Sequence, residues 1–126
     1  MRAIIDIGTN SVRLLMAEKD EKGEWKILRK ELRSTRLGEG MTDKATIGQG
    51  AKERTRSAGG EFTAMAKLEG AKDIFAYGTS IMRDASNGEK FADEVTAAFG
   101  VPVRILSGKE EAYYSYIGAA GSYRGR

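Results

Sequence analysis

The order of strand-like and helix-like segments constrains the fold of this chain most strongly. Residues 2–7, 11–17 and 25–34 are rich in apolar and β-branched side chains, and the second and third of these segments alternate apolar with polar residues. This pattern predicts three consecutive strands. Gly8 marks the end of the first strand, and a turn at 20–24 separates the second from the third. Short connections of this kind produce an antiparallel meander.

The rest of the chain alternates between helices and strands. A loop-like stretch over 35–47 leads into a helix, because Ile47, Ala51, Ala58, Phe62 and Met65 recur at helical spacing. The later segments predict a strand over 73–77, a short helix near 81–85 closed by Asn87-Gly88 as a C-cap pair, a helix over 91–99, a strand over 101–106 and a last helix from about 109 to 120.

Helical crossovers between strands imply parallel pairing, so we predict a mixed sheet with helices on its faces. In such sheets ligands collect at the carboxyl ends of the strands. The segments that follow predicted strand ends are 7–11, 78–83 and 107–111, and these are the places to look for a site.

The composition limits which side chains could act as acids and bases and where the protein could be located. The chain has no Cys and no His, so acid–base chemistry must rest on carboxylates, Lys or Tyr. No apolar run approaches the roughly 20 residues of a membrane span. The N-terminus enters a strand-like segment rather than a signal peptide. We therefore expect a cytoplasmic protein without a membrane partner.

The net charge is +3, and the basic residues are clustered rather than spread evenly. One interpretation is a solvated strand edge and a charged tail; the other is a face that attracts a polyanion. No aromatic residues are interleaved with these charges, so we expect no nucleic-acid partner. The cluster consists of Arg29, Lys30, Arg33 and Arg36, with Arg124 and Arg126 near the end.

The first candidate segment is Asp6-Ile7-Gly8-Thr9-Asn10-Ser11. Its small residues would let backbone N–H groups converge on an anion. Thr9, Asn10 and Ser11 add side-chain donors, and Asp6 could hold a hydrated cation. The alternative is an ordinary hairpin turn, because Gly-Thr-Asn-Ser is common turn chemistry.

The second candidate segment is Gly78-Thr79-Ser80-Ile81-Met82-Arg83. Thr79 or Ser80 would cap a helix whose N-terminus attracts anions, and Arg83 could reach back toward phosphate. The alternative is a plain cap with Arg83 as a surface charge.

The third candidate segment is Ser107-Gly108-Lys109-Glu110-Glu111. Ser107 and Glu110 have the spacing of a capping box, which gives Glu110 a structural role. Glu111 has no such explanation and is the strongest general-base candidate. The alternative for Glu111 is a favourable acidic residue at a helix N-terminus.

Two glycine-containing segments leave alternatives open. Gly59-Gly60 lies inside a predicted helix, where each Gly costs about 1 kcal/mol relative to Ala. The pair indicates either close packing against the sheet or a weak helix. The segment 36–40 (Arg-Leu-Gly-Glu-Gly) is either a loop that shapes a site or an ordinary crossover.

Together these segments resemble the exopolyphosphatase and guanosine pentaphosphate phosphohydrolase family, which belongs to the actin-like ATPase superfamily. The resemblance rests on the order and spacing of four motifs: residues 6–11, residues 36–40, residues 78–83 with Ala85 and Asn87, and residues 106–112. We therefore predict a ribonuclease-H-like domain over 1–126, with a five-stranded sheet of order 3-2-1-4-5 and helices on both faces.

The resemblance also implies roles for individual residues. Glu111 would activate the attacking water, and Asp6 would hold the usual Mg²⁺ cofactor, through water. The phosphate-binding residues would be Gly8, Thr9, Asn10, Ser11, Ser80 and Arg83. The reaction would remove the terminal phosphate of inorganic polyphosphate or the 5′ γ-phosphate of guanosine pentaphosphate.

The chain departs from the family pattern in one large way. Relatives continue into a second domain with a second phosphate loop, Asp-x-Gly-Gly-Gly-Ser, whereas the only Asp-x-Gly here is at residues 6–8. We therefore expect the second domain of the same enzyme as a partner and little activity from the isolated chain. The sequence does not fix the oligomeric state and leaves a homodimer open. The alternatives are a phosphate or alarmone sensor, an interaction module, and a fragment of an ATP-dependent kinase.

Overall fold

A computed structural model of the chain describes residues 1–39 and 46–110. Within them, one sheet has the order β3-β2-β1-β4-β5, antiparallel among its first three strands and parallel from β1 through β4 to β5. The predicted mixed sheet and its order are confirmed. In chain order the elements are β1 (Arg2–Ile7), β2 (Ser11–Lys19), β3 (Trp25–Ser34), α1 (Gln49–Leu68), β4 (Asp73–Gly78), α2 (Ser80–Asp84), α3 (Gly88–Phe99) and β5 (Val103–Ile105).

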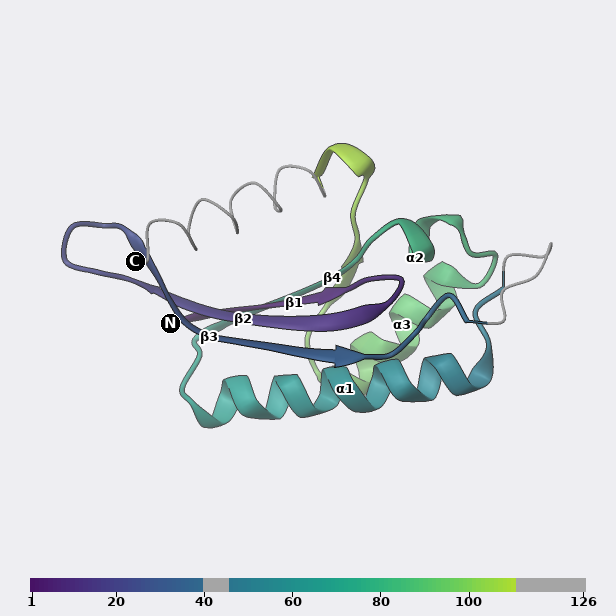
Figure 1. The fold of residues 1–126 in the computed structure, drawn as a ribbon, viewed down its shortest axis with the longest axis horizontal. Helices are drawn as coiled ribbons and strands as arrows, with labels where there is room; N and C mark the ends of the chain where they lie inside the picture. The colour runs from purple at the N-terminus through teal and green to yellow at the C-terminus, as the bar shows by residue number, and fades with distance from the viewer. Residues whose placement is uncertain (40–45, 111–126) are drawn as a thin grey trace.

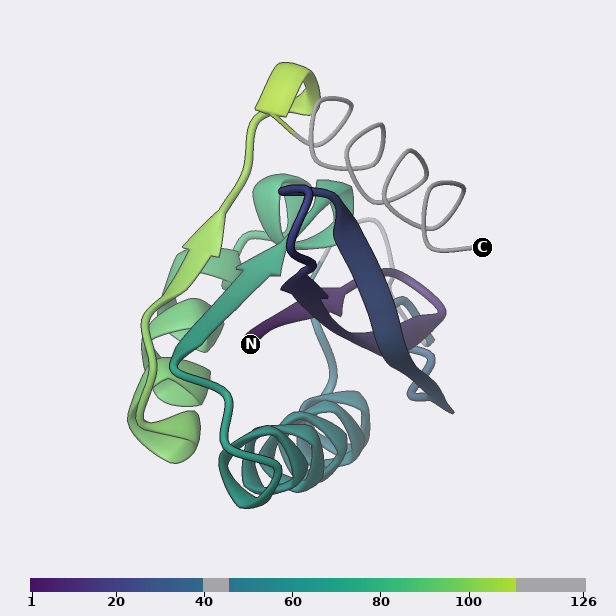
Figure 2. The same cartoon turned by 90° about the vertical axis from the view of Figure 1, so that its left-hand side faces the viewer.

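The core lies between the sheet and one helical layer. Figures 1 and 2 show α1 and α3 side by side against the same face of the sheet. Burying each large apolar side chain contributes about 1.5–3 kcal/mol, so this layer is the main source of stability. The sheet contributes Ala3, Ile5, Ile7, Val12, Leu14 and Met16, and the two helices contribute Ala51, Ala58, Phe62, Ala66, Phe91, Ala92, Val95 and Phe99.

Three strands differ in length from the prediction, and β4 differs only by including Gly78. β2 continues to Lys19, and the register between β2 and β3 shifts after Met16, so that Leu28 is an extra residue in β3. β5 is shorter than predicted and begins at Val103. The preceding Pro102 has no N–H to donate to the ladder, which accounts for the late start. The helix predicted from about Lys109 to Ala120 is described only in its first residues, at 108–110.

The prediction that Asn87-Gly88 closes the short helix is wrong. α2 ends at Asp84, and Asn87 is instead the residue before α3. Its side-chain amide bonds both backbone groups of Ile47: Oδ1 accepts from the N–H at 2.9 Å, and Nδ2 donates to the carbonyl at 3.1 Å. A Cβ at Gly88 would lie 1.9 Å from the carbonyl oxygen of Met82. The pair therefore joins α2, α3 and the segment before α1.

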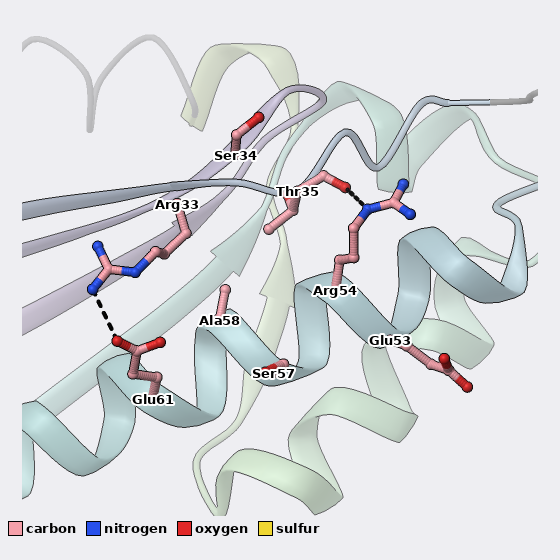
Figure 3. A pocket seen from close by; sticks show the side chains of 8 residues that line it. All are labelled: Arg33, Ser34, Thr35, Glu53, Arg54, Ser57, Ala58 and Glu61. Atoms are coloured by element: carbon pink, nitrogen blue, oxygen red, sulfur yellow. Dashed lines mark hydrogen bonds and ion pairs between the residues drawn. The ribbon is translucent and has the colours of Figure 1, made fainter.

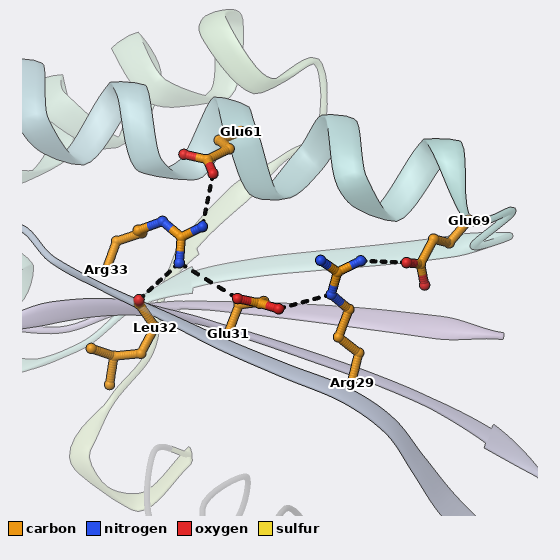
Figure 4. Close-up of polar contacts among 6 residues, drawn as sticks. All are labelled: Arg29, Glu31, Leu32, Arg33, Glu61 and Glu69. Atoms are coloured by element: carbon orange, nitrogen blue, oxygen red, sulfur yellow. Dashed lines mark hydrogen bonds and ion pairs between the residues drawn. The ribbon is translucent and has the colours of Figure 1, made fainter.

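Two basic residues of β3, Arg29 and Arg33, are paired with carboxylates of β3 and of the α1 region (Figure 4). Glu31 accepts from Arg29 Nε at 2.9 Å and lies 3.5 Å from Arg33 Nη1. Arg33 also bonds Glu61 of α1 at 2.8 Å, and Arg29 bonds Glu69. The hydrogen bond from Arg29 holds the pKa of Glu31 below its ordinary value. For Arg29 and Arg33, the structural interpretation of the basic cluster is therefore the better one.

Candidate functional site

The carboxyl ends of the three parallel strands lie next to one another. Ile7 of β1 is in register with Gly78 of β4, and Gly78 with Ile105 of β5. The pairing continues beyond the strands, because Thr79 N–H donates to the Ile7 carbonyl at 3.3 Å and Leu106 N–H donates to the Gly78 carbonyl at 3.0 Å. With strands about 4.8 Å apart, the three candidate segments begin within roughly 10 Å of each other along one sheet edge.

The hairpin between β1 and β2 has its tip at Thr9 and Asn10, which are both exposed. The Gly8 N–H donates to the Ser11 carbonyl at 3.0 Å, so it closes the turn. Among the residues that the structure describes, none accepts a hydrogen bond from the N–H of Thr9 or Asn10. The turn interpretation and the anion-binding interpretation are therefore compatible. The Gly8 N–H closes the turn, and the N–H groups of Thr9 and Asn10 are the donors that could bind an anion.

The loop after β3 orients this tip. The Asn10 carbonyl accepts from the N–H groups of Thr35 and Arg36, both at 3.1 Å, and the Thr9 carbonyl accepts from Gly38 at 3.2 Å. In a trans peptide the C=O and N–H point in opposite directions. Because the Thr9 carbonyl points at Gly38, the Asn10 N–H of the same peptide points away from the loop. Of the segment 36–40, residues 36–39 are described, and they contact the hairpin rather than merely crossing over.

The side chains of Thr79 and Ser80 do not make the helix cap that the sequence predicts. Neither side chain caps α2; the Thr79 hydroxyl is buried and lies 3.4 Å from the Ile7 carbonyl, to which it donates. α2 has only five residues, so its dipole is small, and the anion attraction that we expected at its start has little support. Ser80 is the first residue of α2.

Arg83, at the end of α2, is directed toward β5. Its Nη1 donates to the Leu106 carbonyl at 2.6 Å. This charge-assisted bond places the guanidinium beside the start of the third candidate segment. The predicted contact of Arg83 with phosphate stays a prediction.

The predicted capping box is confirmed. The Ser107 N–H donates to Glu110 Oε1, and the Glu110 N–H donates to Ser107 Oγ, both at 3.1 Å. The backbone N–H of Ser107 is the main cause of a lowered pKa of Glu110, and Arg104 lies 3.5 Å from the same carboxylate. Glu110 thus has the structural role that its spacing indicated. Glu111 lies outside the described residues, so its role as general base stays a prediction.

Asp6 is the candidate for a metal site. It lies one residue before the end of β1, between Arg13 and Tyr77 on the neighbouring strands, and its Oδ1 is shielded from solvent. Over residues 1–39 and 46–110, no three acidic side chains come together as a metal-binding group. Mg²⁺ is often held by one carboxylate together with substrate phosphates and water, so a single Asp is compatible with it.

A shallow pocket of about 440 Å³ lies between the end of β3 and α1 (Figure 3). Its two guanidiniums are already engaged, because Arg33 bonds Glu61 and Arg54 bonds the Thr35 carbonyl. Glu53 and Glu61 balance the two positive charges. The guanidiniums of this pocket are therefore engaged within the protein, and the strand ends remain the candidate site. No described helix is long and apolar enough to cross a membrane.

Known proteins resemble this chain in both sequence and structure. It is 35% identical to exopolyphosphatase 2 of Mycobacterium tuberculosis over 127 residues, which cover 94% of the chain and 40% of the relative. It is 32% identical to a bifunctional 3-dehydroquinate synthase/phosphatase of Fusobacterium nucleatum, over 98% of the chain and 19% of the relative. The chain thus spans less than half the length of these relatives.

Among solved structures, the Aquifex aeolicus member of the Ppx/GppA family superposes with a TM-score of 0.87 at 28% identity, over 98% of this chain and 40% of that one. An exopolyphosphatase from Cytophaga hutchinsonii gives a TM-score of 0.82 at 26% identity, over 89% and 36%. The model of the Ppx/GppA phosphatase family matches residues 15–126. This chain therefore belongs to the Ppx/GppA phosphatase family.

Proposed function

We propose that this chain is the N-terminal domain of a phosphohydrolase that removes the terminal phosphate of inorganic polyphosphate or the 5′ γ-phosphate of guanosine pentaphosphate. The observation that carries the proposal is the hairpin tip. Thr9 and Asn10 present N–H groups that bond no described residue, at an edge where three strand ends meet. Family membership supports the phosphatase chemistry.

Each candidate residue would have its own role in phosphoryl transfer. The N–H groups of Thr9 and Asn10, with the hydroxyls of Ser11 and Ser80, would hold phosphate oxygens. Arg83 would neutralise their charge through its guanidinium. Phosphoryl transfer depends mainly on positioning and charge neutralisation, which suits a site of amides and an arginine.

Two further groups complete the proposed reaction. Glu111 would accept a proton from the attacking water, because acid–base chemistry in a chain without His rests on carboxylates, Lys or Tyr. Mg²⁺ would be held by Asp6 through water and would neutralise charge on the phosphates. The second domain expected from the relatives would supply the other side of the cleft, so the isolated chain should bind phosphate chains with little turnover.

The test is phosphate release from polyphosphate and from guanosine pentaphosphate by the complete natural protein. Glu111→Ala should abolish release while binding of the same compounds stays measurable. The matched control is Glu110→Ala, which removes a neighbouring carboxylate of structural role and should lower stability without abolishing release. Turnover by Glu111→Ala at the wild-type rate would contradict the assignment, and a protein that binds but never releases phosphate would be a sensor.

A further inference from the structure

Arg54 of α1 makes a set of contacts with the loop after β3 that sequence analysis did not indicate. Its Nε donates to the Thr35 carbonyl at 2.8 Å (Figure 3). Its Nη2 lies 3.4 Å from the Arg36 carbonyl and 3.2 Å from Glu39 Oε1. One guanidinium therefore contacts three residues of the loop 35–39, namely Thr35, Arg36 and Glu39. The planar fork of Arg can bridge such acceptors, whereas the single ammonium of Lys cannot match that geometry.

The loop that Arg54 holds has an unusual backbone. Arg36 has φ +47°, and it is the one residue other than Gly with a positive φ in the described part of the chain. An L-residue in this region is strained and keeps its conformation only where its surroundings hold it there. Thr35 and Leu37 on either side are almost fully buried, while the Arg36 side chain stays exposed. The bonds from Arg54 to the two carbonyls supply part of that restraint.

The same loop orients the hairpin. Its N–H groups at Thr35, Arg36 and Gly38 donate to the carbonyls of Asn10 and Thr9. Space is also tight, because a Cβ at Gly38 would lie 3.0 Å from the Thr9 methyl group. A displacement of the loop would therefore turn the peptide that carries the Asn10 N–H.

We propose that Arg54 is a positioning residue of the phosphate-binding hairpin: from α1 it fixes the loop 35–39, and through this loop it sets the direction of the Asn10 N–H. The expected effect of Arg54 on phosphate binding rests on the proposed function. The coupling of Arg54 to the hairpin does not, because it can be measured without any ligand.

The test compares Arg54→Ala and Arg54→Lys with Arg56→Ala in the full chain. Arg56 is the matched control, because it lies on the same helix, is similarly exposed and pairs with Glu94 away from the loop. Amide hydrogen exchange of Arg36 and Gly38 reports the loop, and the amide resonances of Thr9 and Asn10 report the hairpin. Calorimetric titration with inorganic tripolyphosphate reports binding.

Both Arg54 variants should speed exchange at Arg36 and Gly38, shift the Thr9 and Asn10 resonances, and weaken tripolyphosphate binding about tenfold, the equivalent of one lost charge-assisted hydrogen bond. Arg56→Ala should leave all three readouts at wild-type values. Rescue by Arg54→Lys would mean that charge alone matters and would overturn the proposal. Unchanged exchange and resonances in Arg54→Ala would overturn it too, whereas a wild-type chain that binds no tripolyphosphate would count against the proposed function.

Discussion

The ring of Phe99 lies directly against the backbone of Gly59. A Cβ at Gly59 would lie 1.9 Å from Phe99 Cζ, so α1 and α3 approach each other where α1 has no side chain. The neighbouring Gly60 has open space around the same position. Close packing of α1 against α3 therefore explains Gly59, whereas packing gives no reason for Gly60.

The two glycines should respond oppositely to the same substitution. Gly59→Ala should destabilise the domain by about 1–3 kcal/mol, because the new methyl group must displace the Phe99 ring. Gly60→Ala should stabilise it by about 0.5–1 kcal/mol, because Ala loses less backbone entropy in a helix. Urea denaturation of both variants provides the check. Equal destabilisation by the two would show that the packing against Phe99 is not the reason for Gly59.

Asn87 should contribute strongly to stability although it is only part-buried. Asn87→Ala would leave the N–H and the carbonyl of Ile47 without their partner, at a cost of about 1–3 kcal/mol in unfolding free energy. Ser86→Ala is the control, since the bond of the neighbouring Ser86 hydroxyl to Thr46 is exposed. It should change the unfolding free energy by less than about 0.5 kcal/mol. Equal effects of the two variants would argue against the Asn87 bridge.

The pKa of Glu110 should depend on Ser107. Because the Ser107 N–H stabilises the carboxylate, the pKa of Glu110 lies below its ordinary 4.5 in the folded chain. The stabilisation is therefore present above pH 4.5 and is lost as the pH falls through the lowered pKa. Ser107→Pro removes that N–H and should move the Glu110 pKa upward in a carboxylate NMR titration. An unchanged pKa would mean that Arg104 alone causes the shift.

The ion pairs between β3 and α1 should be sensitive to salt and acid. Glu31 joins Arg29 and Arg33 (Figure 4), and its lowered pKa means that acid weakens this connection as the pH falls through that pKa. Glu31→Gln should lower the Tm in dilute buffer, and the difference from wild type should shrink in 1 M NaCl, where charges are screened beyond about 3 Å. Glu21→Gln, in the turn before β3, should change little. A Glu31→Gln difference that persists in high salt would point to packing instead.

Strand positions could be predicted because they follow from local periodicity, whereas the order of the strands in the sheet followed from the family resemblance. β1 and β3 have the predicted bounds, and the alternation of Val12, Leu14 and Met16 places them on the buried face. The capping box was predictable for the same reason, since Ser107 and Glu110 are three residues apart and bond each other.

Long-range contacts of polar side chains could not be predicted in the same way. Asn87 bonds a residue 40 positions away, and Arg54 bonds carbonyls 18 and 19 positions away. No sequence spacing encodes such pairs, because they arise only once helices pack on the sheet. For this reason the sequence wrongly predicts Asn87-Gly88 as a helix end and gives no sign of the link from Arg54 to the hairpin.

The most direct test of the central claim is a titration of the isotope-labelled chain with inorganic tripolyphosphate, followed through its backbone amide resonances. Sodium sulfate at matched ionic strength is the control. We expect saturable shifts that are largest at Thr9 and Asn10, where the N–H groups bond no described residue. Saturable shifts centred on the shallow pocket between β3 and α1, which Arg33 and Ser57 line, with Thr9 and Asn10 unchanged, would contradict a phosphate site at the hairpin.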